Sequence, residues 1–206
     1  MTRTLLHNER YDVLNTLALK KMATAETIAD ASGLSADQVR NTLQSLAADG
    51  LAVTVGDQAL PTDVALPALV ASAAQRYRDL REDPAVLDMA GKFEVVNGKF
   101  LVAISSWQQV EVGGRKIAND HEDSEYDSKV LARMDKLVSR LQQLIEVLTV
   151  RDPRFEYYVR RFSRATERID EGHVDYVSSP TLDSVHNVWF EFHEDLLRTL
   201  GRARTE

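Results

Sequence analysis

Apolar positions at the start of the chain recur at helical spacing. Tyr11, Leu14 and Leu17 are three residues apart, so they predict a first helix that ends near the cations at 20–21. A second, short helix follows, with Thr24 as its N-cap and Ile28 on its inner face. Two neighbouring helices are therefore expected before residue 33.

The next segment combines a helix start, a helix stop and an alternating stretch. Ser35 and Gln38 have the spacing of a capping box, and Gly50 stands where a left-handed residue ends many helices. Between them, one apolar stripe is formed by Val39, Leu43 and Leu46. Residues 51–60 then alternate around Gly56-Asp57, which predicts a small two-stranded hairpin.

This succession of helix, short helix, turn, capped helix and hairpin resembles the winged helix-turn-helix domains of MarR-type bacterial regulators. The resemblance implies a domain over residues 1–62 whose third helix, about 36–49, enters the major groove of DNA. Arg can pair with guanine, and Asn or Gln with adenine. The outward residues expected to contact DNA are Ser35, Asp37, Arg40, Asn41, Gln44 and Ser45.

The charge of this segment argues against DNA binding. Residues 1–60 hold five cations against seven anions, and the predicted hairpin holds no cation. Because phosphate neutralisation supplies most nonspecific affinity for DNA, a single copy would bind DNA weakly. A winged helix used for protein contacts or dimerisation therefore stays open as the alternative.

Residues 63–84 predict a connecting helix. Asp63 is the expected cap, and one side carries Leu66, Leu69, Val70, Ala73 and Tyr77. Charged residues accumulate before Pro84, where we place a domain boundary. This stripe, together with the apolar seam of 130–148 described below, offers more apolar surface than one small bundle needs, so we expect a homodimer.

Residues 85–108 fit two structures. Asn97-Gly98 is typical of a two-residue hairpin, but Phe93, Ile104 and Trp107 belong to a three-to-four repeat that runs over five turns. We favour the helix, in which Asn97 would face inward. The glycine-containing stretch 110–116 is expected to be a loop.

The remaining chain predicts a helical bundle over residues 85–206. A helix capped by Ser124 or Asp127 carries a heptad-spaced seam typical of a bundle core: Val130, Met134, Leu137, Leu141, Leu144 and Leu148. Two more helices follow, at 154–171 and 184–200, the last capped by Thr181 or Asp183. The fold class is thus mainly α, a winged helix-turn-helix domain followed by an α-helical bundle.

Candidate chemistry gathers around three histidines and a run of arginines. His186 and His193 lie two turns apart on the last helix, too far to share one metal by themselves, and His121 lies in an Asn-Asp-His-Glu-Asp loop. Hydrogen-bonded structural histidines are the commoner outcome, so no metal is expected. Helix 154–171 and its approach carry six arginines, which suit either an anionic ligand or a solvated face paired with acids.

The second domain resembles the helical C-terminal region of some bacterial pyruvate phosphate dikinase-like proteins. The matching stretches are Trp107-Gln108, the segment 119–127, Pro153-Arg154-Phe155 with Tyr158 and Arg161, and the segment 180–197. Nothing in the chain matches a nucleotide-binding or phosphohistidine domain, so the resemblance implies a free-standing regulatory or accessory version. It also implies that one ligand or partner pocket is formed by Trp107, Asn119, His121, Arg154, Arg161, His186, Trp189, Glu191 and His193.

Composition narrows the function further. The chain has no cysteine, no apolar leader and no run of about 20 apolar residues, which fits a cytoplasmic protein that does not enter membranes. No phosphate loop, nucleophile elbow or dinucleotide fingerprint is present, so an enzyme would depend on histidine and carboxylate chemistry alone. We expect no cofactor.

The leading hypothesis is a ligand-responsive, DNA-binding transcriptional regulator. The alternative is a non-catalytic accessory protein of a phosphotransferase that handles pyruvate or phosphoenolpyruvate. In either case His121, Arg161, His186 and His193 are expected to converge in a pocket walled by Trp107 and Trp189, which would suit a small anionic ligand.

Overall fold

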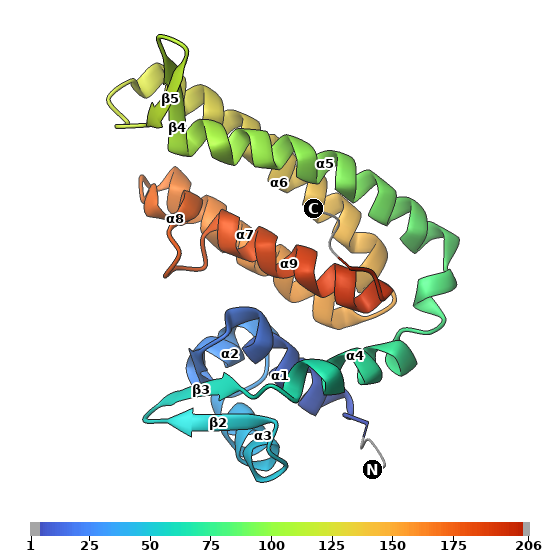
Figure 1. The fold of residues 1–206 in the computed structure, drawn as a ribbon. Helices are drawn as coiled ribbons and strands as arrows, with labels where there is room; N and C mark the ends of the chain where they lie inside the picture. The colour runs from blue at the N-terminus through green and yellow to red at the C-terminus, as the bar shows by residue number, and fades with distance from the viewer. Residues whose placement is uncertain (1–4, 204–206) are drawn as a thin grey trace. The chain divides into compact units, whose positions relative to one another are not determined.

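The computed structural model describes residues 5–203 and is mainly helical (Figure 1). The chain forms two compact units. The first ends at Asp83 and resumes at Trp189, and the second runs from Pro84 to Val188. No helix in the described range is long and apolar enough to span a membrane.

The helices of the first unit begin where the capping residues predict. Thr24 accepts a hydrogen bond from the Thr27 amide, and Ser35 and Gln38 form a complete capping box, so both N-caps are confirmed. Gly50 has φ 72°, the left-handed geometry expected after the third helix. The helices are α1 (Asn8–Lys20), α2 (Ala25–Ser32), α3 (Ala36–Ala48) and α4 (Ala65–Arg76).

A small antiparallel sheet completes this unit. The predicted hairpin is confirmed as β2 (Ala52–Val55) and β3 (Gln58–Pro61), with Thr54 opposite Ala59. A third, two-residue strand, β1 (Ala23–Thr24), pairs with β3, so the order is β1-β3-β2. A strand of two residues is too short to show an alternating pattern, so β1 could not be predicted from the sequence. Ala23, Ala52 and Ala59 are buried and join this sheet to the helical core.

Helix α4 departs from the prediction at its start and on one flank. Its N-cap is Val64, without a side-chain hydrogen bond, because a backbone turn from Thr62 to Ala65 delays the helix past Asp63. Its core side is made mostly of small residues, which allows close approach to the rest of the unit. Consequently Leu66 and Val70, expected on one side with Leu69 and Ala73, are exposed while Leu69 and Ala73 are buried.

The second unit opens with one long helix, α5 (Pro84–Gln108), which confirms the helical alternative for this segment, with Asn97 buried. The expected loop at 110–116 is wrong, because β4 (Gln109–Val112) and β5 (Arg115–Ala118) form a hairpin. Gly113 and Gly114 both have positive φ, as a tight turn between twisted strands requires. The alternation of Val110 and Val112 with polar residues was the feature of the sequence that indicated a strand here.

The second unit continues with helices after this hairpin. The seam from Val130 to Leu148 is buried within the chain, as expected of bundle core. The elements of this unit are α6 (Ser124–Thr149), α7 (Glu156–Asp170), α8 (Asp175–Ser178) and the first turn of α9 (Val185–Leu200), with a 3-10 turn at Pro153–Phe155. The rest of α9 and a 3-10 turn at Leu80–Glu82 belong to the first unit.

Two helix starts in this unit use other residues than predicted. Asp123 caps α6 by accepting from the amides of Glu125 and Tyr126. At α9 the Ser184 hydroxyl accepts from the Asn187 amide, while Asp183 is engaged by Arg161. In each case a residue one position away from the predicted candidate has its oxygen in reach of the helix amides.

Candidate functional site

The polar face of α3 is exposed as predicted, but its one cation is already paired. Ser35, Asp37, Arg40, Asn41 and Gln44 are all exposed. The Arg40 guanidinium contacts Glu26 at 2.5 Å and Asp37 at 2.5 Å. A hydrogen bond from its own backbone amide and the Arg40 guanidinium lower the pKa of the Glu26 carboxyl. The face therefore presents a neutralised arginine between two carboxylates.

Two other cations of this unit are engaged in the same way. Arg10 contacts the Ser45 hydroxyl and the Asp49 carboxylate. Lys20 forms an ion pair with Glu191 on α9, with Nζ 3.1 Å from Oε1. Pairing of this kind leaves little positive charge for phosphate groups.

The Lys20 pair belongs to a buried polar seam between α1 and the part of α9 in the first unit. The Asn15 amide nitrogen donates to Asp195 Oδ1 at 2.9 Å, and its oxygen accepts from Arg198. Arg81 donates to the carbonyls of Thr199 and Arg198 at the end of α9. Sequence reasoning missed this seam; Asn15 beside the apolar stripe of α1 was the only hint.

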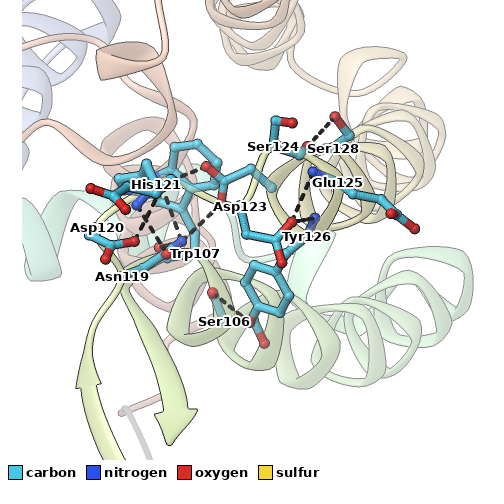
Figure 2. Close-up of polar contacts among 12 residues, drawn as sticks. Ser106, Trp107, Asn119, Asp120, His121, Asp123, Ser124, Glu125, Tyr126 and Ser128 are labelled. Carbon is cyan, nitrogen blue, oxygen red and sulfur yellow. Dashed lines mark hydrogen bonds and ion pairs between the residues drawn. The ribbon is translucent and has the colours of Figure 1, made fainter.

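In the second unit, three of the predicted pocket residues meet. Figure 2 shows Asn119 and His121 beside Trp107, where the loop after β5 returns to the end of α5. The His121 ring lies on the Trp107 indole with centroids 4.3 Å apart. His121 Nδ1 is 2.8 Å from Asp127 Oδ2, on the first turn of α6.

The contacts of Asn119 and Asp127 indicate a proton on Nδ1 of His121. The Asn119 amide nitrogen is 2.8 Å from Asp127 Oδ1, 3.1 Å from the Trp107 carbonyl and 3.2 Å from His121 Nδ1. The Asn119 side-chain amide has two hydrogens, which it donates to the Trp107 carbonyl and to Asp127 Oδ1. The short distance between His121 Nδ1 and Asp127 Oδ2 is then explained by a proton on Nδ1 that is donated to the carboxylate.

The loop that carries His121 is tied at both ends. The Asn119 side-chain oxygen accepts from the His121 amide, and Asp123 caps α6. Tyr126 Oη donates to the Ser106 carbonyl at 2.9 Å, as Figure 2 also shows. These contacts hold His121 at φ 62°, a left-handed conformation that side chains with a Cβ rarely adopt.

This conformation leads to a first prediction. His121→Gly and His121→Ala both remove the ring, but only alanine retains the backbone strain. Left-handed geometry costs a residue with a Cβ about 1–2 kcal/mol, partly offset by the greater entropy of unfolded glycine, so the glycine variant should be more stable by roughly 1 kcal/mol in urea unfolding.

The matched pair at Ser128, exposed in the helix α6, serves as the control. There the alanine variant should be the more stable one, by roughly 0.5–1 kcal/mol. If alanine is also preferred at position 121, the strain attributed to this residue is absent.

The arrangement can orient a single imidazole. With Nδ1 facing Asp127, Nε2 is the ring nitrogen left for another partner, and the side chain is 38% exposed. Among residues 5–203, no group of three or more His, Asp or Glu side chains is placed to hold a metal ion. The site thus consists of one partly exposed imidazole held between Trp107 and Asp127.

The other predicted pocket residues have partners of their own. Arg161 makes two hydrogen bonds to Asp183, at 2.7 and 2.9 Å, and Arg154 lies over the Phe155 ring and 3.4 Å from Asp152. Trp189, Glu191 and His193 belong to the first unit and are buried. Convergence of all nine residues on one pocket stays a prediction.

His186 packs beside Phe100, with ring centroids 6.3 Å apart. Burial disfavours its charged form and lowers the pKa of His186 from its usual value of 6.5. Above that value the imidazole is neutral in the folded and unfolded states alike. As pH falls below it, the unfolded state takes up a proton first, so His186 lowers stability on the acid side.

We therefore expect the variant His186→Gln to lose less stability than the wild type between about pH 7 and pH 5. The measurement is the urea midpoint of both proteins across this range. Curves that stay parallel would show that His186 does not titrate differently on folding.

Comparison of the chain with models of protein families, with curated proteins and with solved structures found no match.

Proposed function

We propose that the chain is a non-catalytic regulatory protein whose first unit is a winged helix-turn-helix domain that works through protein contacts. The domain assignment is supported by the order α1-β1-α2-α3-β2-β3, the tight turn between α2 and α3, and a hairpin directly after α3. The second unit would be the helical bundle expected from the sequence.

The pairing of the cations with carboxylates favours protein contacts over DNA binding. Residues 5–62 contain four cations and seven anions, and three of those cations, Arg10, Lys20 and Arg40, contact carboxylates. A protein that neutralises few phosphates gains little of the counterion release that drives DNA binding. A neutral to acidic α3 face is better suited to a polar protein surface.

Binding to DNA is the second candidate, and one observation favours it. Asn41 and Gln44 are both exposed and lie one turn apart on α3. Each can pair with adenine through two hydrogen bonds. A duplex from upstream of the chain's own gene is the natural target to try.

The test is fluorescence anisotropy with that upstream duplex and a scrambled duplex of equal length, at about 50 mM and about 200 mM salt. We expect weak binding without preference between the two duplexes. Glu26→Gln with Asp37→Asn releases Arg40 and should strengthen binding to both duplexes equally. Submicromolar preference for the upstream duplex, lost in Asn41→Ala with Gln44→Ala, would overturn protein contact in favour of a DNA-binding regulator.

The resemblance of the second unit suggests which protein to try as partner. A phosphotransferase that uses pyruvate or phosphoenolpyruvate, encoded beside this chain, should change its rate when the chain is added. The α3 surface variant Asn41→Ala with Gln44→Ala should weaken that effect. An unchanged phosphotransferase rate at a saturating concentration of the chain would exclude this enzyme as a partner.

A further inference from the structure

Helix α6 carries as many cations as carboxylates, but the two kinds lie on different sides of the helix. The exposed cations form what we call the basic ridge: Lys129, Arg133, Lys136 and Arg140. Because they are three or four positions apart, they fall within a sector of about 60° around the helix axis. Of the carboxylates on α6, only Glu125 lies beside this sector, at its beginning, and the others lie at least about 80° away.

Helix α5 adds two lysines to the edge of the basic ridge. Helices α5 and α6 pack antiparallel to each other (Figure 1), and Tyr126 Oη on α6 donates to the Ser106 carbonyl on α5. Seven residues turn a helix by about 700°, close to two full turns, so residues seven apart stay on one side. Steps of seven from this contact, back along α5 and forward along α6, bring together two pairs of cations: Lys99 with Arg133, and Lys92 with Arg140.

The middle of this surface has no carboxylate to offset its charge. Asp88 and Glu125 each pair with the outermost lysine at one end. In the described part of the chain, no hydrogen bond or ion pair engages the side chains of Lys99, Arg133 or Lys136. The whole chain holds 32 carboxylates against 25 cations, so composition does not explain neighbouring cations that lack a counterion. Like charges close together repel each other, and an anion bound from outside would relieve that repulsion.

We propose that the basic ridge, together with Lys92 and Lys99, binds the phosphate backbone of duplex DNA without reading its sequence. A single strand is a poorer match, because its bases need aromatic rings to stack on and no exposed residue of α5 or α6 is aromatic. An acidic protein is also a poorer match. Protein interfaces are depleted of lysine and have an apolar centre, which a ridge of cations does not provide.

The dimensions of the basic ridge fit this ligand. Lys129 and Arg140 are 11 positions apart, which is about 16 Å along the helix axis. Over that length one strand of a duplex presents about five phosphates, since they follow each other at about 3.4 Å along the duplex axis. Four of the six cations are not held by a carboxylate: Lys99, Arg133, Lys136 and Arg140. About four phosphate contacts are therefore expected.

This binding surface lies in the second unit and goes beyond the function proposed for the first. It supplies weak DNA binding that is equal for any two duplexes of the same length. The α3 variant Asn41→Ala with Gln44→Ala should leave that binding unchanged, because neither residue belongs to the ridge. Failure of the protein contacts proposed for the first unit would not alter this result.

Fluorescence anisotropy of the full chain with a labelled duplex, between about 50 and 200 mM salt, counts the phosphates contacted. Four contacts predict about a 150-fold loss of affinity over this range, and Arg133→Gln with Lys136→Gln should reduce the loss to about tenfold. Arg160→Gln with Arg164→Gln is the control, because it changes the net charge equally on the exposed side of α7. Helix α7 contacts α6 through Gln142, about 150° around the helix from the ridge.

Circular dichroism should be the same for the wild type and both arginine variants, because the replaced side chains are exposed. No duplex binding at about 50 mM salt would overturn the proposal, as would an equal change of the salt dependence in the α6 variant and the α7 control. Loss of binding in Asn41→Ala with Gln44→Ala would place the DNA contact on α3 instead. Competition by polyglutamate or by phosphatidylserine vesicles that is stronger than competition by unlabelled duplex would also refute it, in favour of an acidic protein or a lipid surface.

Discussion

Replacing Lys20 by methionine is expected to destabilise the protein by about 3 kcal/mol, the lower end of the cost of breaking a buried ion pair. The Lys20 and Glu191 side chains are only 9% and 8% exposed, and their charged atoms lie 3.1 Å apart. Removal of the lysine leaves the carboxylate buried without this counterion. The lower end applies because Glu191 makes further contacts that remain.

The double variant Lys20→Met with Glu191→Met should recover most of this loss, because two apolar side chains of similar volume replace both charges. Urea unfolding of the wild type, the two single variants and the double variant gives the coupling energy directly. Lys92→Met, which breaks the exposed pair with Asp88, is the control and should cost no more than about 0.5 kcal/mol. Additive effects of the two single variants would contradict the ion pair.

Loss of the Asp183 carboxylate is expected to cost about 1.5–3 kcal/mol, the range for charged hydrogen bonds. The Arg161 guanidinium is 4% exposed and donates two hydrogen bonds to Asp183, while the carboxylate is 39% exposed. Asp183→Ala would remove both hydrogen bonds from a buried guanidinium, whose remaining contacts include the Tyr158 ring, 5.6 Å away. Partial solvation of the site keeps the effect below that of a fully buried pair.

Arg161→Lys separates geometry from charge at the same site. A lysine retains the charge but cannot make the paired hydrogen bonds, so it should lose roughly 1 kcal/mol or more. Arg160→Lys, on the exposed pair with Glu156, is the matched control and should be nearly neutral. Equal effects at positions 160 and 161 in thermal or urea unfolding would show that burial of Arg161 does not matter.

The sequence alone determined the secondary structure wherever a local signal was strong. The capping box at Ser35 and the seam from Val130 to Leu148 depend on spacings of three to seven residues, and both are present as predicted. The long helix over 84–108 prevailed over an Asn-Gly hairpin because its apolar repeat runs for many turns. A weak alternation beside two glycines was missed, and a hairpin stands where a loop was expected.

Only the tertiary structure decided the partners of the polar groups. Asn15 and Asp195 are 180 positions apart, and no pattern in sequence couples them. The same holds for Arg40, whose exposure followed from helical periodicity, whereas its neutralisation by Glu26 depends on how α2 packs on α3. Periodicity reports which face of a helix is buried, because burial acts along one element. Pairing of charges depends on the distance between elements, which the folded chain alone sets.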